Sequence, residues 1–153
     1  MAKSNFSLNF DGFIDYAKQL GQLGENYLQK AVDNAFNASK EYVNNEVSKA
    51  MDASRYNFDG TGYSRGKAKR SLSLVKTMPV EWSGTVAKAY IGVRMRDALE
   101  VQFIIHGVSG NPHMPKDTNL YNAIKVKGKH KKKVEEIQKE EFNKVIEEAL
   151  RNG

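Results

Sequence analysis

The stretch from Asp11 to Ala53 contains no proline and has helical periodicity, and it constrains the fold more than any other feature of the chain. Its apolar residues recur roughly every three or four positions, as in an amphipathic helix. We expect a long N-terminal helix with Asp11 as N-cap, because a carboxylate there accepts free amide protons of the first turn. Gly21 and Gly24 each weaken a helix interior by about 1 kcal/mol relative to alanine, so a break there would give a short helix and then a longer one.

An unbroken helix of this length would be longer than its own domain. At about 1.5 Å per residue it would span ~60 Å, whereas a compact domain of this size has a radius of gyration of ~15 Å. Either the helix bends back at the glycines, or another chain covers part of its apolar stripe, because such an exposed stripe is a liability in a soluble monomer. Of these two arrangements we favour self-association.

The size and composition of the chain indicate a single folded domain over residues 1–153. With 153 residues and 40% apolar content, the chain has enough material for one hydrophobic core. No run approaches the ~20 apolar residues of a membrane helix, and the polar start lacks the apolar core of a signal peptide. We therefore expect a cytoplasmic protein without membrane contact. The absence of cysteine excludes disulfides and thiolate chemistry.

The middle of the chain reads as two flexible loops around a group of short strands. Turn residues at Asp59 to Gly62 and a cationic run predict a loop near 55–70, and glycines and prolines predict another at 107–117. Between them, apolar and β-branched residues predict an antiparallel meander. Its turns are expected at Ser83-Gly84 and near Arg96-Asp97. Its strands are expected at Leu72 to Met78, Val80 to Ser83, Val86 to Arg94 and Leu99 to His106.

The last part of the chain predicts helices. A short one is expected over Thr118 to Ile124, and a Lys-rich run, Lys125 to Lys133, leads into an amphipathic helix from Val134 to Leu150. The acidic first turn of that helix suits the partial positive charge at a helix start. The predicted fold class is α+β, with the long N-terminal helix and the C-terminal helix packed on a small antiparallel sheet.

The net charge of +6 is unevenly distributed along the chain. Residues 55–133 hold 16 Lys/Arg against 5 Asp/Glu, a net charge of +11, whereas the flanking segments hold 8 against 13, a net charge of −5. A basic centre of this kind suits a nucleic-acid backbone or an acidic protein surface. A merely solvated face is the third interpretation.

Residues with catalytic chemistry occur without a recognisable catalytic pattern. His106 and His113 match no metal-binding spacing, and Ser109, His113 and Asp117 lack the glycine pattern of a nucleophile elbow. The glycines of Asp59 to Gly62 lack the Gly-Lys-Ser/Thr end of a phosphate-binding loop. We therefore expect no enzyme, with no catalytic residue, cofactor or metal. Trp82 is interpreted as a core or interface anchor.

The order of elements resembles the neck or tail-completion proteins that join head and tail in long-tailed bacteriophages. Thr61-Gly62 with Arg70-Ser71-Leu72 is similar to that family's Thr-Gly, basic, Ser-Ile segment, and Phe103 to Met114 is similar to its aromatic, Gly and Met-Pro loop. Several positions depart from the family pattern. Extra residues separate Thr61-Gly62 from Ser71, the Pro before the Asp-Thr-Gly turn is missing, and Ile105-His106-Gly107 replaces Glu-Phe-Gly.

The resemblance implies a non-enzymatic, ring-forming subunit of the virion, assembled in the host bacterial cytoplasm. Its implied partners are copies of itself, the head connector, and tail terminator or tail tube proteins, with the passing double-stranded DNA as a further candidate. The candidate docking loop contains His106, Gly107 and Met114. The candidate contacts with DNA or an acidic neighbour are Arg65, Lys67, Lys69 and Arg70.

A basic nucleic-acid-binding module is the alternative to a virion subunit. The two hypotheses differ in their response to salt, because a phosphate binder loses affinity steeply as salt rises. A ring subunit is instead expected to assemble with little affinity for DNA of its own. A small enzyme is the third hypothesis.

Overall fold

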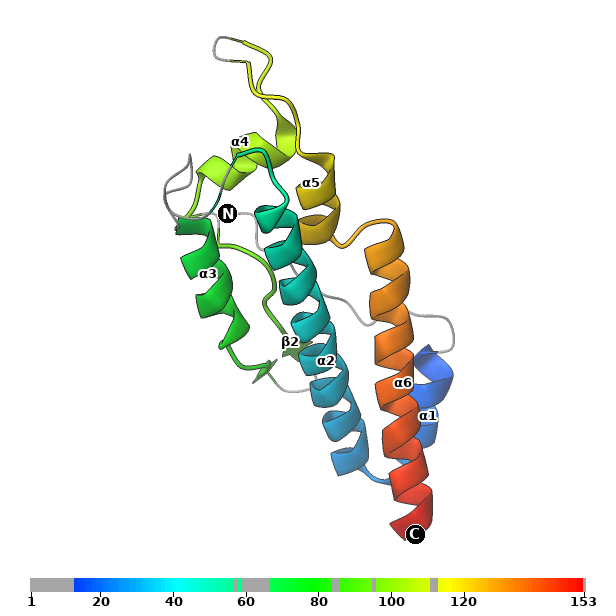
Figure 1. Cartoon of the computed structure of the whole chain (residues 1–153). Helices are drawn as coiled ribbons and strands as arrows, with labels where there is room; N and C mark the ends of the chain where they lie inside the picture. The colour runs from blue at the N-terminus through cyan, green and yellow to red at the C-terminus, as the bar shows by residue number, and fades with distance from the viewer. Residues whose placement is uncertain are drawn as a thin grey trace.

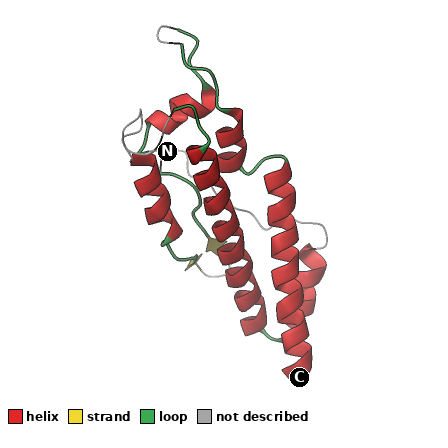
Figure 2. Ribbon diagram, viewed as in Figure 1, coloured by secondary structure: helices red, strands yellow, loops and turns green. Residues whose placement is uncertain are grey.

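The computed structural model describes residues 13–56, 58, 67–83, 86–94, 96–110 and 113–152, so the predicted N-cap Asp11 lies outside the described part. The described chain is mostly helical with one two-stranded antiparallel sheet, which confirms the predicted α+β class (Figure 2). In chain order the elements are α1 (Phe13–Leu23), α2 (Glu25–Asp52), α3 (Lys67–Lys76), β1 (Glu81–Ser83), β2 (Val86–Lys88), α4 (Glu100–His106), α5 (Thr118–Lys125) and α6 (Lys129–Asn152).

Gly24 separates the expected long N-terminal helix into α1 and α2. Its φ of 138° is a conformation that L side chains rarely adopt, so glycine is required at this position. The chain turns back here, and α1 packs against both α2 and α6 (Figure 1). The apolar stripe of α2 is therefore covered within the same chain, and the length of the helix no longer argues for self-association.

Helices α2 and α6 lie antiparallel along the long axis of the molecule (Figure 1). Tyr42 meets His130 near one end of the pair, and Lys30 meets Glu148 near the other. The buried apolar residues form two clusters. The upper cluster in Figure 1 joins the second half of α2 to α3, α4 and α5, and the lower cluster joins its first half to α1, the hairpin and the second half of α6.

A belt of buried polar residues lies between these two apolar clusters. Ser39 and Lys40 on α2 fall between Phe36 of the lower cluster and Val43 of the upper one. On α6, Gln138 likewise falls between Val134 of the upper cluster and Phe142 of the lower one. The Lys40 ammonium donates to the carbonyl oxygen of Met78, and burial lowers the pKa of Lys40 below its ordinary value. The belt therefore holds the end of the α3 segment on α2.

The hairpin is the only part of the predicted meander that the described structure contains. β1 and β2 pair antiparallel, with Trp82 opposite Ala87. The predicted strand from Val80 to Ser83 is close to β1, whereas the one from Val86 to Arg94 is right only at its start, because β2 ends at Lys88. Trp82 packs against the lower apolar cluster, as expected of a core anchor.

Helix α3 occupies most of the segment predicted as a strand from Leu72 to Met78. It begins at Lys67, so the last residues of the loop predicted near 55–70 are helical instead. The sequence alternates serine and leucine here, which favoured a strand, but the buried positions follow a helical period instead. Packing of that face against the upper cluster outweighs the local preference. The buried residues of α3 are Ala68, Ser71, Leu72 and Val75.

Helix α4 replaces the strand predicted from Leu99 to His106. Its valine and isoleucine residues favour strands in isolation, but they fill the upper cluster at helical spacing. The loop predicted at 107–117 falls between α4 and α5, with residues 111 and 112 outside the described part, and turn residues at Arg96 and Asp97 agree with the predicted turn. The buried residues of α4 are Val101, Ile104 and Ile105.

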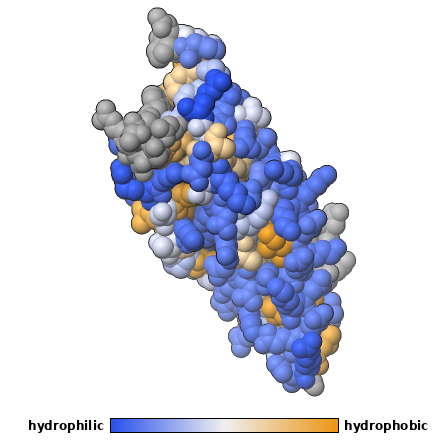
Figure 3. All heavy atoms as spheres, viewed as in Figure 1, coloured by the Kyte–Doolittle hydropathy of each residue, from blue (hydrophilic) through white to orange (hydrophobic). Residues whose placement is uncertain are grey.

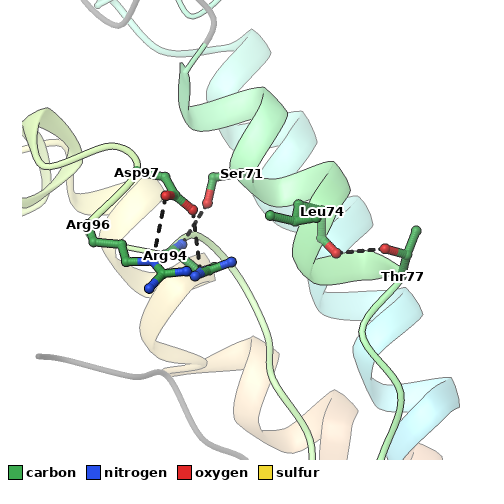
Figure 4. A network of polar contacts seen from close by, with 6 residues as sticks. All are labelled: Ser71, Leu74, Thr77, Arg94, Arg96 and Asp97. Carbon is green, nitrogen blue, oxygen red and sulfur yellow. Dashed lines mark hydrogen bonds and ion pairs between the residues drawn. The ribbon is translucent and has the colours of Figure 1, made fainter.

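A polar network joins α3 to the segment that leads into α4 (Figure 4). The buried Ser71 Oγ accepts a hydrogen bond from the backbone N–H of Arg94 at 2.8 Å. The Asp97 carboxylate lies between two guanidinium groups, 3.4 Å from Arg94 Nε and 3.8 Å from Arg96 Nε (Figure 4). Thr77 Oγ1 donates to the Leu74 carbonyl at 2.8 Å and closes the end of α3. The bond from Arg94 to Ser71 joins α3 to the approach to α4, and the other contacts order each of these two segments.

Helix α5 confirms the short helix predicted over Thr118 to Ile124. Asp117 caps it, because its Oδ1 accepts a hydrogen bond from the Leu120 backbone N–H at 3.0 Å. Helix α6 confirms the predicted C-terminal helix but begins at Lys129, so the expected acidic first turn is wrong. Its first turn contains lysines and no carboxylate, and this difference matters for the functional surface.

Candidate functional site

The predicted cationic contacts divide between α3 and residues that the structure does not describe. Arg65 lies outside the described residues, and Lys67, Lys69 and Arg70 lie in the first turn of α3. Lys67 and Arg70 are exposed, but the Lys69 ammonium is 2.6 Å from Asp52 Oδ1 on α2. Part of the positive charge predicted for partner binding is thus neutralised within the chain.

The predicted docking loop is held at its base by its own backbone. Val108 and Met114 form a bridge, with N–H to O distances of 2.7 Å and 2.9 Å. Gly107 has φ 77°, and a Cβ there would lie 3.0 Å from the backbone N of Lys116, so a side chain would clash. Met114 packs partly against the upper apolar cluster rather than pointing outward. The base of this loop is therefore built into the fold, while Ser109, Gly110 and His113 are exposed.

The tyrosine ring of Tyr121 on α5 gathers three basic side chains. Lys116 Nζ lies 4.0 Å from the ring centroid and Lys127 Nζ 5.8 Å from it, both within cation–π range. The ring of His106 meets it edge-on, with centroids 5.7 Å apart. Tyr121 therefore joins the predicted docking residue His106 to lysines from the loop and from the turn after α5.

The densest group of lysines in the described part of the chain lies around this ring and on the first two turns of α6. We call it the lysine surface, and its members are Lys116, Lys125, Lys127, Lys129, Lys131, Lys132 and Lys133. All are exposed except Lys125, which is half-buried. In the described part of the chain, one ion pair involves this set, Lys133 Nζ to Glu136 Oε2 at 3.9 Å, and both partners are exposed. Exposed pairs of this kind are worth about 0–1 kcal/mol.

The turn between α5 and α6 that carries this surface has an unfavourable backbone conformation. Val126 has φ 53° and ψ 58°, the left-handed region, which is a genuine outlier for a β-branched residue. The turn is held by the Lys127 N–H, which donates to the Asn122 carbonyl at 2.9 Å, and Gly128 follows with φ 63°. Val126 also packs on the upper cluster. Core packing therefore maintains the turn that brings Lys127 back over Tyr121.

Sequence reasoning missed this surface because it placed the candidate contacts at Arg65 to Arg70. In the sequence, the run from Lys125 to Lys133 is a clear charge run, but its pattern predicts only the approach to a helix. Two signals were available: the lysine density itself, and the absence of any carboxylate between Lys125 and Lys133. The approach of Lys116 and Tyr121 depends on the fold and has no local sequence signal.

The structure gives Asp117 a structural role and leaves the other two residues of the hypothetical triad, Ser109 and His113, exposed. Asp117 accepts from Ser54 Oγ at 2.7 Å as well as from the Leu120 N–H, so both its oxygens serve the local structure. His113 and Ser109 are exposed on the loop. Across the described ranges, no group of three or more His, Asp and Glu residues is arranged to hold a metal ion. No helix of the described chain is long and apolar enough to cross a bilayer.

Exposed apolar residues stand at both ends of the elongated molecule. Leu99 is 60% exposed and Phe103 46% exposed, and their spacing of four residues puts them on one face at α4. Leu150 is 61% exposed near the end of α6, at the opposite end of the long axis (Figure 1). The face in Figure 3 is otherwise largely hydrophilic, with apolar surface limited to separate small areas.

Comparisons of the chain with protein-family models, curated proteins and solved structures gave no match.

Proposed function

We propose that the protein is a structural virion protein of a tailed bacteriophage, a neck or tail-completion subunit that joins the head connector to the tail around the DNA channel. The observation that carries the proposal is a polarity along the elongated molecule: lysines gather at one end, the rest of α6 has a net negative charge, and large apolar side chains are exposed towards both ends. Such ends suit a contact between successive copies of the chain. The sequence resemblance described above supplies the biological setting.

One end of the molecule is basic. Helix α3 has four Lys/Arg and no carboxylate, and residues 116–133 have seven Lys against one Asp, a net charge of +6. Phe103 on α4 and Leu99, the N-cap of α4, lie at this end. The combination provides an apolar contact surrounded by positive charge.

Beyond its first turns, helix α6 is acidic as it runs towards the other end. Residues 134–152 of α6 have six Glu against three Lys/Arg, a net charge of −3. Leu150 is exposed within this segment, and Lys30 on α2 neutralises one of its carboxylates through Glu148 at 2.7 Å. We take Leu150, with Glu147 and Glu148 close to it in the sequence, as the counterpart of the basic end.

Contact between unlike ends is heterologous, and a heterologous contact repeated around an axis closes into a ring when the rotation allows it. Complementary charge favours the correct partner and speeds encounter, whereas buried leucine and phenylalanine provide the apolar contact. A ring of this kind supports contacts to the head connector and to tail terminator or tail tube proteins. In this role the protein is not an enzyme, needs no cofactor, and is located in the virion after assembly in the bacterial cytoplasm.

Light scattering after size exclusion, over a concentration series, tests the proposal. We expect a closed oligomer for the unchanged chain, and dissociation when Phe103→Asp or Leu150→Asp places a carboxylate at either end. The control is Asn37→Asp, at an exposed position in the middle of α2, which adds the same charge away from both ends. A monomer at every concentration, alone and with head or tail proteins added, would count against the ring subunit. A monomer that binds DNA only at low salt would favour the nucleic-acid module.

A further inference from the structure

The lysine surface combines three segments that are separate in the sequence. Lys116 comes from the loop before α5, Lys127 from the turn after it, and Lys129, Lys132 and Lys133 from the first two turns of α6. The last three occupy positions i, i+3 and i+4, so they share one face of the helix. The fold thus concentrates positive charge on one continuous side of the basic end.

This arrangement opposes helix stability. Lysine ammonium groups lie at the end of α6 that already carries the partial positive charge of the helix dipole, and no carboxylate stands in the first turn. The nearest acidic residues in sequence are Glu135 and Glu136, one turn later, and of these Glu136 contacts Lys133 at 3.9 Å. Residues whose local preferences oppose the structure they occupy are expected at functional sites. A bound polyanion would relieve this repulsion.

The chemistry of the surface favours phosphate over an acidic protein. Protein interfaces have an apolar core and are depleted in lysine, whereas phosphate backbones are bound by lysine charges and by free backbone N–H groups at helix starts. The exposed positions from Lys127 to Lys133 are lysines and a glycine, and the other residue in this run, His130, is buried against Tyr42. An acidic protein partner would find no apolar anchor within this run, because the exposed Leu99 and Phe103, assigned above to the contact between copies, belong to a different element, α4 and its N-cap.

The aromatic ring within the surface is not arranged to stack on bases. Binding of single strands uses exposed aromatic platforms, but Tyr121 is half-buried, has Lys116 over its ring and meets His106 edge-on. The surface therefore suits the phosphates of a duplex, read without regard to sequence. The α3 cations are a weaker candidate, because Lys69 is held by Asp52 at 2.6 Å.

We propose that the lysine surface at the α5–α6 junction binds the phosphate backbone of double-stranded DNA, and that it does so through neutralisation of phosphates rather than base contacts. This inference deepens the proposed function, on which its biological setting rests, by assigning the DNA contact to Lys116, Lys127 and the start of α6. It moves the contact away from Arg65 to Arg70, where the sequence placed it.

The test measures binding of a fluorescent duplex of mixed sequence to the full chain, by anisotropy over a series of NaCl concentrations. The variant Lys129→Gln, Lys132→Gln, Lys133→Gln removes three charges from the surface. The matched control, Lys139→Gln, Lys144→Gln, Arg151→Gln, removes three charges from exposed positions further along the same helix. Both variants have the same net charge.

For the surface variant we expect affinity at low salt to fall by at least about tenfold and the slope of log K against log salt to become shallower by about 2 to 3. The control should keep the slope of the unchanged chain. The surface variant should also melt at a higher temperature, by about 2 °C or more, because it removes cations from a helix start. That increase shows that the loss of binding does not come from unfolding.

Three results would overturn the inference: no duplex binding by the unchanged chain at low salt, an equal loss in both variants, or binding only to vesicles with anionic lipid or to poly-glutamate. The mass of the protein is recorded in the same samples. An oligomer that ignores DNA would retain the ring subunit and reject the DNA surface. A monomer whose duplex binding needs the three lysines would retain the DNA surface and reject the ring subunit.

Discussion

The indole Nε1 of Trp82 donates a hydrogen bond to Asp33 Oδ1 at 2.7 Å, and this contact attaches the small hairpin to the first half of α2. The acceptor is a carboxylate, which makes the bond stronger than a neutral one. Trp82 also packs on the lower apolar cluster, so the hairpin is held by both an apolar and a polar contact.

Removal of the acceptor, the Asp33 carboxylate, should destabilise the protein measurably. We expect Asp33→Ala to lower the free energy of unfolding by about 1.5–3 kcal/mol, because it leaves the indole N–H without its charged acceptor. Urea denaturation followed by far-UV circular dichroism measures this. Trp82→Phe and the double variant complete a mutant cycle, and additive effects in that cycle would mean that the hydrogen bond contributes nothing.

Gly24 should be intolerant of substitution. Gly24→Ala places a Cβ on a backbone with φ 138° and should cost about 1–3 kcal/mol. Gly21→Ala is the matched control, since Gly21 is exposed within α1 with nothing within 4 Å of the added Cβ, and it should be stabilising by about 0.5–1 kcal/mol. Thermal melts of the two variants should therefore move in opposite directions. Equal shifts would contradict the special role of Gly24.

Gln138 should be replaceable by an apolar residue with a gain in stability. Its side-chain amide is buried on α6 and makes no hydrogen bond with the described residues. The buried Ser39 Oγ on α2 also makes none with them. Gln138→Met keeps a flexible side chain of similar length and removes the desolvation penalty, so we expect a gain of about 1 kcal/mol or more in denaturant melts. A loss of stability would show that the polar belt has partners that make it favourable.

Stability should fall as the pH drops below about 6.5, the ordinary pKa of histidine. Burial lowers the pKa of His130 in the folded state; the Glu46 carboxylate opposes this and the Lys129 ammonium adds to it. Between the ordinary pKa and the lowered one, the unfolded chain binds a proton that the folded chain does not, so folding weakens as pH falls through this window.

Denaturant midpoints at pH 7.5 and at pH 5.5 measure the effect of His130. The variant His130→Gln should lose much of the difference, although it also loses the contact of 3.1 Å between Tyr42 Oη and Nδ1. His113→Gln, at an exposed position, is the control and should keep the full difference. A pH dependence that persists unchanged in His130→Gln would contradict the assignment.

The segments predicted correctly are those in which local pattern and tertiary burial agree. Helices α2 and α6 have apolar residues at helical spacing over several turns and α5 over about two, and in the sequence β1 is followed by the turn signal Ser83-Gly84. The misread segments are short and ambiguous. In α3 the Ser71-Leu72-Ser73-Leu74 sequence alternates as a strand does, and in α4 Val101, Ile104 and Ile105 have high strand propensity. The helical period in these two segments becomes visible only through the residues that the upper cluster buries.

The candidate surface was predictable in its charge and not in its location. Lysine density alone does not distinguish the α3 cations from those of α6, because the difference is the ion pair from Lys69 to Asp52, which lie on different helices. Similarly, Lys116 and Lys127 lie on either side of α5 in the sequence and meet only over Tyr121. Both facts depend on long-range packing, which has no local sequence signal.

The dependence of α2 on α6 also determines when this protein is able to fold during its synthesis. Helix α2 leaves the ribosome well before α6, and Phe142, Val145 and Ile146, which cover its first half, are made only after all the other described helices. Until then the nascent chain presents an uncovered apolar stripe and depends on rapid completion or on chaperones. A chain that terminates before Phe142 should therefore aggregate, however well its earlier helices form.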